Sequence, residues 1–232
     1  MSRPTVRPES ANRLLSRLSR ADFARLEPHL EAVDLPVRKM LEARNTRVEY
    51  AYFIEIGFAS VVANLSSYPD GIEVGLIGKE GITGLGVILG CNDRAETDTY
   101  MQLAGSGRRI RAADLRRAIA SSATLHQMLL TYVYGYLRQV MQTAAANGRG
   151  KIEERLARWL LMASDRAGDE LQLTQEFLAI MLGIRRAGVI SALQALEVQG
   201  LITRRRGAIA ILDRDGLIER SKGTYVSSDV DW

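Results

Sequence analysis

Residues 173–202 read LTQEFLAIMLGIRRAGVISALQALEVQGLI, and this stretch decides the fold. It predicts two short helices joined by a tight turn at Gly183, because glycine permits a backbone bend that side chains resist. Thr174 precedes the first helix at a position where a hydroxyl can cap it. Apolar residues recur at helical spacing along the second helix: Val189, Leu193 and Leu196. This arrangement favours a helix-turn-helix over a helical hairpin that only fills a core.

The outer face predicted for the second helix is polar and basic. Its members are Arg185, Arg186, Ser191 and Gln194. Such groups can reach phosphates and base edges in a major groove. Two short β-rich stretches follow, and the basic run between them predicts a hairpin with a basic tip, or wing: Arg204, Arg205 and Arg206. An arginine triplet is often only a solvated turn, but directly after a helix-turn-helix we expect it to contact the DNA backbone.

The composition is that of a soluble protein with a real core. The chain has 232 residues, 47% hydrophobic and 25% charged, which is enough for one large or two modest domains. The net charge of +4 leans basic but does not by itself indicate nucleic acid. The start, MSRPTVRPES, lacks the apolar segment of a signal peptide, and no apolar run is long enough to span a bilayer. We therefore expect a cytoplasmic protein without a membrane partner.

The first 120 residues combine two short helices with many short β-rich runs. Apolar residues at helical spacing predict the helices: Leu14, Leu15 and Leu18, then Phe23, Leu26 and Leu30. The β-rich runs are 50–56, 58–65, 72–77, 97–104 and 108–111. Turns are predicted between them at Gly57, at Pro69-Asp70-Gly71 and at Gly105-Ser106-Gly107. Short strands with glycine-rich turns predict a sandwich or a small barrel.

Residues 123–147 form the longest helical pattern. Five residues keep the spacing of a coiled-coil seam: Leu130, Val133, Leu137, Val140 and Ala144. A second apolar stripe lies beside it: Leu125, Leu129, Tyr132 and Tyr136. Two stripes on a nearly uncharged helix favour two partners, its own β domain and the same helix of a second subunit; the alternative is a helix buried inside one domain. A dimer also suits a helix-turn-helix, since such dimers read half-sites about 34 Å apart.

The sequence Asn-Gly-Arg-Gly at residues 147–150 predicts a hinge after this helix. A further helix is predicted over residues 151–164, where Glu154 and Arg158 have the i, i+4 spacing of an ion pair. The predicted domains are therefore a β domain at 1–120, a dimerisation helix at 121–148 and a winged helix-turn-helix at 149–232.

Three motifs accompany this layout. They are ERLARWLL at 154–161, LTQEFLA at 173–179 with Leu182-Gly183, and Arg206-Gly207 followed by Ile211-Leu212-Asp213-Arg214. Layout and motifs together resemble the Crp/Fnr family of bacterial transcription regulators over most of the chain. The resemblance implies an α+β fold: an N-terminal cupin-like double-stranded β-roll that senses an effector, a long dimerisation helix and a C-terminal winged helix-turn-helix. It implies a homodimer that binds a palindromic promoter site in double-stranded DNA, with RNA polymerase as a candidate partner.

The recognition helix departs from the family pattern Gly-x-Ser-Arg-Glu-Thr-Val. Arg186 matches the arginine that reads guanine O6 and N7, whereas Arg185 replaces the capping serine and is expected on a phosphate. Ala187 replaces a glutamate that accepts from cytosine, so part of the operator is expected to differ. Gly188 weakens the helix by about 1 kcal/mol relative to alanine but permits close approach to a phosphate. The candidate DNA contacts are Thr174, Gln175, Arg185, Arg186, Gly188, Ser191, Arg204, Arg205 and Arg206.

The candidate effector region runs from Gly78 to Tyr100, and it does not carry the cyclic-AMP cassette of the family. Leu85 follows Gly84 where that cassette has glutamate, and Arg94-Ala95 comes too early and without a hydroxyl residue. The iron–sulfur members need several cysteines, and only Cys91 is present. Cys91 is expected to be a small buried hydrophobe, with a redox switch as the alternative. The effector is left unidentified.

Enzymatic function is not expected, and neither is a cofactor, a metal site or a catalytic residue. A metal-dependent cupin enzyme needs several histidines on its strands, whereas His29 and His126 both fall in predicted helices. A second hypothesis is a ligand-binding or protein-interaction module with a vestigial DNA domain. The altered recognition residues Ala187 and Gly188 motivate it.

Overall fold

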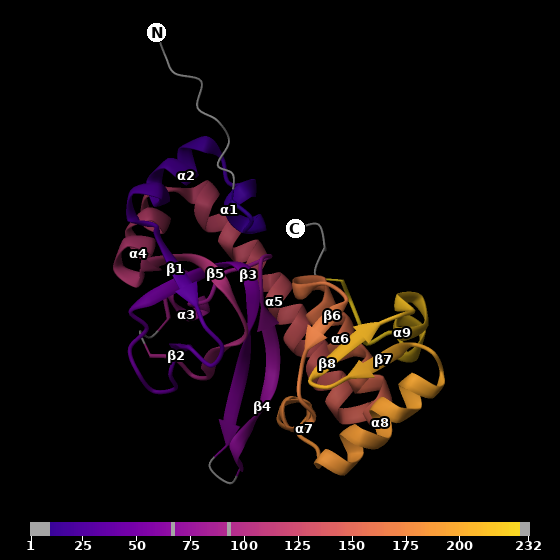
Figure 1. Ribbon diagram of the computed structural model, residues 1–232. Helices are drawn as coiled ribbons and strands as arrows, with labels where there is room; N and C mark the ends of the chain where they lie inside the picture. Colours follow the sequence, from indigo (N-terminus) through magenta and orange to yellow (C-terminus); the bar gives the residue numbers. More distant parts are fainter. Residues whose placement is uncertain (1–9, 66–67, 92–93, 228–232) are drawn as a thin grey trace. The chain divides into compact units, whose positions relative to one another are not determined.

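The computed structural model describes residues 10–65, 68–91 and 94–227 (Figure 1). Contacts divide the chain into two compact units. Unit 1 comprises Met1–Gly57 and Ile77–Tyr134, and unit 2 comprises Phe58–Leu76 and Gly135–Trp232. Two stretches of backbone pass from one unit to the other: the pair of strands β3 (Tyr50–Leu65) and β4 (Tyr68–Ile77), and the helix α5 (Ala123–Arg149).

Two short N-terminal helices of unit 1 confirm the apolar pattern read from the sequence. They are α1 (Arg13–Arg17) and α2 (Arg20–Leu26), followed by the 3₁₀ turn η1 (Glu27–His29). Asn12 and Ser19 cap them, each accepting a hydrogen bond from a backbone N–H in the first turn. Leucines on their inner faces are buried. Two more helices of this unit, α3 (Leu85–Ile88) and α4 (Ala112–Ser121), follow later in the chain.

The strands of the β-rich part are β1 (Glu31–Leu35), β2 (Met40–Glu42), β3, β4 and β5 (Asp98–Arg111). They pair in the order β1-β5-β3-β4, and β2 also pairs with β5. The β1–β5 pair is antiparallel, with Glu31 opposite Arg109 and Leu35 opposite Gly105. The N-terminal part is therefore the β-rich domain that the sequence predicts, built on antiparallel pairing.

Three predicted turns are wrong, because the glycines that suggested them lie inside long strands. Residues 50–65 form one strand, with Gly57 within it, and residues 98–111 form another that contains Gly105 and Gly107. A Cβ atom on Gly105 would lie 1.9 Å from the carbonyl oxygen of Ile56, and one on Gly107 would lie 2.3 Å from that of Phe53. These glycines permit close cross-strand approach. Residues 69–71 likewise fall within β4; residues 66–67 lie outside the described residues.

Helix α5 confirms the long helical pattern and carries both apolar stripes. Leu125, Leu129 and Tyr132 of one stripe are buried, and the Tyr132 hydroxyl donates to the carbonyl oxygen of Ile82 at 2.9 Å. Every residue of the seam stripe keeps some exposure in the single chain: Leu130, Val133 and Val140 are half-buried, and Leu137 and Ala144 are exposed. The exposed side chain of Leu137 retains 49% of its accessible area.

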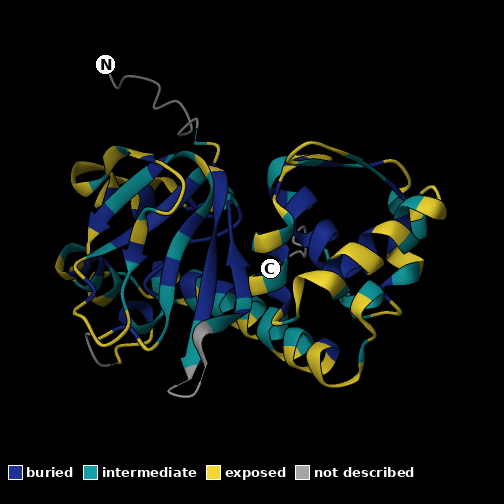
Figure 2. Cartoon of the chain, turned by 60° about the horizontal axis from the view of Figure 1, so that its bottom comes forward, coloured by how far each residue is buried: buried dark blue, intermediate teal, exposed yellow. Residues whose placement is uncertain are grey.

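Unit 2 contains the C-terminal helices and a small sheet. The helices are α6 (Ile152–Ala167), α7 (Gln175–Leu182), α8 (Arg186–Val198) and α9 (Arg214–Arg220). The strands β6 (Glu170–Gln172), β8 (Ala208–Ile211) and β7 (Ile202–Arg205) pair in that order. Helix α6 is the centre of this unit, since its residues from Leu156 to Ser164 are all buried (Figure 2).

The expected ion pair between Glu154 and Arg158 does not form in the described structure. Glu154 instead caps α6, accepting from the backbone N–H of Lys151 at 3.0 Å. Arg158 is buried and donates to Gln139 O at 3.2 Å, Thr143 Oγ1 at 3.0 Å and Thr224 O at 2.9 Å. The i, i+4 spacing predicted a solvated pair, but a buried guanidinium needs acceptors around it, and these come from other segments.

Candidate nucleic-acid interface

Helices α7 and α8 form the helix-turn-helix that the sequence predicts. The Thr174 hydroxyl caps α7, accepting from Phe177 N at 3.2 Å. Gly183 ends α7 with φ of 61°, the left-handed conformation that favours glycine. The two helices then pack through buried apolar residues: Leu178, Met181, Leu182, Val189, Ala192, Leu193 and Leu196.

The outer face of α8 carries the predicted recognition residues. Arg185, Arg186, Ala187, Ile190, Ser191 and Gln194 are exposed, and Gly188 is half-buried. Arg185 occupies the N-cap in an extended conformation, and its guanidinium, which has no acceptor, does not cap the N–H groups of the first turn. The exposed Ser191 hydroxyl donates to the carbonyl oxygen of Ala187 at 3.1 Å.

Arg186 has two acceptors from the start of α7. Its Nη1 lies 2.9 Å from Glu176 Oε1, and its Nη2 donates to Gln175 Oε1 at 3.4 Å. The side chains of Arg186 and Glu176 are each 60% exposed. Arg186 and Gln175 are both predicted from the sequence to lie in the interface, whereas Glu176 is not predicted as a partner of Arg186. The signal that could have found it is a carboxylate in the first turn of the preceding helix.

The wing forms as predicted, but its three arginines differ. Strands β7 and β8 pair antiparallel, with Arg205 opposite Ala208, and Gly207 turns between them with φ of 75°. Arg204 is bound to Glu197 of α8: its backbone N donates to Oε1 at 2.9 Å and its Nε to Oε2 at 2.7 Å. These hydrogen bonds lower the pKa of Glu197. Arg205 and Arg206 are exposed at the tip.

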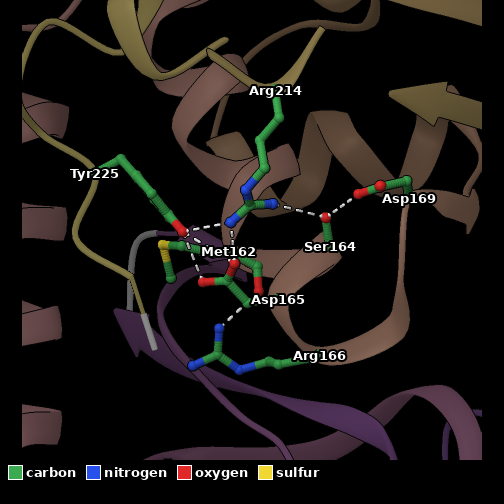
Figure 3. Close-up of polar contacts among 7 residues, drawn as sticks. All are labelled: Met162, Ser164, Asp165, Arg166, Asp169, Arg214 and Tyr225. Carbon is green, nitrogen blue, oxygen red and sulfur yellow. Dashed lines mark hydrogen bonds and ion pairs between the residues drawn. The ribbon is translucent and has the colours of Figure 1, made fainter. Parts of the chain in front are cut away.

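A polar cluster ties the segment after the wing to α6 (Figure 3). Arg214, at the start of α9, forms an ion pair with Asp165 and donates to Ser164 Oγ at 3.0 Å and to Tyr225 Oη at 2.7 Å. The Tyr225 hydroxyl donates to Asp165 at 2.9 Å. Burial, followed by the charge of Asp165, raises the pKa of Tyr225 to about 12. Sequence reasoning missed this cluster, which fixes where β8 and the wing end.

The predicted effector region, described except for residues 92 and 93, contains the short helix α3. Gly84, with φ of 79°, precedes the short helix α3, and its backbone N–H donates to Glu42 Oε1 at 2.7 Å. Burial raises the pKa of Glu42. A cavity of about 370 Å³ lies beside it, lined by residues of β2 and the start of β3, among them Glu42, Tyr50 and Tyr52. These residues lie outside the predicted region, and Cys91 is exposed, contrary to the expectation that it is buried.

No helix in the described ranges is both long and apolar enough to cross a bilayer. Residues 154–220, which run from α6 through α9, match the family described as the Crp-like helix-turn-helix domain. No curated protein matches the chain.

Solved structures with the same fold cover most of the chain. FixK2 from Bradyrhizobium japonicum is 18% identical with a TM-score of 0.70, covering 82% of this chain and 96% of that one. A CRP-family transcriptional regulator from Thermus thermophilus is 18% identical with a TM-score of 0.65, covering 83% and 97%. The c-di-GMP responsive global regulator CLP of Xanthomonas campestris is 15% identical with a TM-score of 0.65, covering 83% and 99%. Residues 154–220 are therefore a Crp-like helix-turn-helix domain, in a chain that has the fold of the Crp/Fnr transcription regulators.

Proposed function

We propose that the protein is a homodimeric, sequence-specific DNA-binding transcription regulator that acts in the cytoplasm. The observation that carries this proposal is the exposed outer face of α8, where Arg186 lies in the first turn, directly after a helix α7 that Thr174 caps and Gly183 ends. A helix in this setting enters the major groove with its N-terminal residues at the base edges. The β-rich domain at residues 1–120 senses a signal and repositions the winged domain at 149–232.

The DNA contacts in this proposal divide by chemistry. Arg186 reads a base, and Ser191, five residues further along α8, is also exposed. Phosphates are bound by Thr174 and Gln175 at the start of α7, by Arg185 and Gly188 beside the turn, and by the wing arginines. Among these arginines, the exposure of Arg205 and Arg206 favours them over Arg204, whose guanidinium already bonds Glu197.

The dimer in this proposal forms along α5, within residues 121–148. The seam residues Leu130, Val133, Leu137, Val140 and Ala144 are incompletely buried in the single chain. Next to them Tyr134 and Met141 keep 61% and 51% of their accessible area. An apolar stripe of this length on a nearly uncharged helix is suited to a second copy of the same helix. Two copies would present two recognition helices to a palindromic promoter site, where RNA polymerase is the proposed partner.

The signal sensed by the roll is a small molecule other than an anionic nucleotide. Glu42 supports this part of the proposal, because its half-buried carboxyl group already accepts from the backbone N–H of Gly84, at the start of α3. That N–H is therefore not free to donate to a phosphate. The 370 Å³ cavity lined by Glu42, Tyr50 and Tyr52 is the candidate site, in place of the region from Gly78 to Tyr100.

The proposal is tested by selecting genomic fragments that the purified full chain retains at physiological salt. We expect a shared palindrome with half-sites about one helical turn apart. Binding that shows no preference for selected fragments over random duplex would contradict sequence-specific regulation. It would instead support the second candidate function, a ligand-binding or protein-interaction module with a vestigial DNA domain. The ion pair between Arg186 and Glu176 favours this alternative, since it neutralises the candidate base reader.

A further inference from the structure

The exposed face of α8 carries apolar side chains between its polar ones. Arg186, Ile190 and Gln194 are all exposed and follow one another at intervals of four residues. Residues at this spacing form one row along a helix, so Ile190 lies between the two long polar side chains. Ala187 is exposed too, and it adjoins Ile190 because it precedes it by three residues. Ala187 and Ile190 are called the apolar patch below.

The apolar patch is not part of the core that holds α8 in place. Val189, Leu193 and Leu196 are buried and pack the helix inward, whereas Ile190 keeps 37% of its accessible area. A single exposed isoleucine is common on protein surfaces. Ile190, however, lies in the row that begins with the candidate base reader, one turn beyond Arg186. Its place on the helix therefore directs it toward the same groove.

The apolar patch cannot form hydrogen bonds with base edges through its side chains. Next to it, the Ser191 hydroxyl donates its proton to the carbonyl oxygen of Ala187 at 3.1 Å, so this proton is used within the helix. An apolar side chain that covers a donor or acceptor of a base removes its water without replacing the hydrogen bond, which is unfavourable. The patch therefore disfavours base pairs that present only donors and acceptors to it.

Thymine presents the apolar partner that such a patch requires. Its C5-methyl group points into the major groove, where the other distinguishing features of the base pairs are hydrogen-bond donors and acceptors. Burying this methyl group against Ile190 is favourable in the same way as burial in a protein core. A thymine is thus selected both by the contact that it gains and by the penalty that other bases incur.

The helix geometry relates this thymine to the base read by Arg186. Four residues of α-helix rise about 6 Å, and successive base pairs are about 3.4 Å apart. We propose that the apolar patch, mainly through Ile190, reads the methyl group of a thymine one or two base pairs from the guanine that Arg186 reads. This specificity rests on the proposed function, since it requires α8 to lie in a major groove.

The test is a uracil scan of the selected fragment, because deoxyuridine in place of thymidine removes only the methyl group. Each thymine of one half-site is replaced in turn, and fluorescence anisotropy measures the dissociation constant. We expect one position at which the wild type loses affinity by about fourfold, the contribution of one buried methyl group. Replacing each guanine by 7-deazaguanine locates the base that Arg186 reads, since the loss of N7 should weaken the wild type but not Arg186→Ala.

Variants of α8 assign the effect to Ile190. Ile190→Ala should bind the unmodified fragment more weakly and lose the penalty for uracil at that one position. Ile190→Val keeps a β-branched apolar side chain and should retain most of the penalty. Val198→Ala is the matched control, because Val198 is apolar and 82% exposed but lies at the other end of α8, and it should keep the wild-type profile. Thermal midpoints should change little in all three, since these positions are exposed.

A uracil scan that is flat in the wild type, or the same in the wild type and Ile190→Ala, would overturn this specificity. A sensitive thymine more than about two base pairs from the guanine of Arg186 would overturn the assigned spacing. Each of these results requires a selected fragment, so the proposed function would stand. Absence of any selected fragment would contradict the proposed function and the specificity together.

Discussion

Nη1 of Arg186 lies 2.9 Å from Oε1 of Glu176, so the candidate base reader carries its own counter-charge. DNA must displace or share this carboxylate, and a carboxylate near phosphates is itself repelled. An exposed ion pair is worth about 0.2–1 kcal/mol. We therefore predict that Glu176→Gln tightens binding to the selected fragment by roughly 1.4- to fivefold, from that ion-pair range. Fluorescence anisotropy measures the dissociation constant. Glu219→Gln is the control, because it removes the same charge from an exposed position of α9. Equal affinities for the two variants would contradict the prediction.

Replacement of Arg186 should remove specificity more than affinity. A bidentate arginine–guanine contact contributes about 1–3 kcal/mol of discrimination. Arg186→Ala should therefore bring the affinity for the selected fragment close to that for random duplex, whose own affinity should change little. Competition between the two duplexes measures the ratio. A ratio unchanged from the wild type would mean that another residue reads the base.

The wing arginines should behave differently from Arg186 and from each other. Arg205 is exposed, so Arg205→Ala should weaken binding to all sequences and lower the salt slope by about one. Arg204 bonds Glu197, so Arg204→Ala should lower the thermal midpoint more than it lowers DNA affinity. Salt titrations and thermal melts of both variants separate these effects. If Arg204→Ala lowered the DNA affinity and the salt slope more than Arg205→Ala does, the phosphate contact would lie at Arg204.

The helix-turn-helix could be predicted because its determinants are local. Thr174, Gly183 and the apolar spacing of α8 act within one turn of where they stand, and the structure has the cap, the turn and the inward face in those places. The turns predicted at Gly57, Gly105 and Gly107 are wrong because the role of these glycines depends on a strand that is distant in sequence. A glycine that opens a turn and one that admits a neighbouring strand look alike until the partner strand is known.

The least predictable features join residues that are distant in sequence. Glu73 and Trp159 are 86 positions apart, and nothing in either neighbourhood indicates the other. Arg158 has helical spacing to Glu154, yet burial on α6 directs it to Gln139, Thr143 and Thr224. Local spacing predicts which groups are available, but only the packing of the helices decides which of them meet.

The seam on α5 makes a prediction about assembly. Leu137→Glu places a charge in the middle of the predicted seam, and a buried unpaired charge is strongly unfavourable. We expect light scattering to give a monomer of 25.7 kDa. Losing the second half-site should reduce affinity for the full palindrome by about 10²-fold or more. Gln127→Glu adds the same charge to an exposed position of α5 and should leave the assembly unchanged; a dimeric Leu137→Glu would place the interface elsewhere.

Tyr225 makes a prediction about stability and its dependence on pH. Tyr225→Phe removes the hydroxyl that joins Asp165 and Arg214 and should cost about 1–3 kcal/mol. The folded state raises the pKa of Tyr225 from 10.0 to about 12. Its contribution is thus fully present below pH 10 and is lost as the pH rises from there toward 12. Thermal melts should show the difference between wild type and variant shrinking over this window. A difference between wild type and Tyr225→Phe that stays constant across this window would show that the hydroxyl does not ionise there.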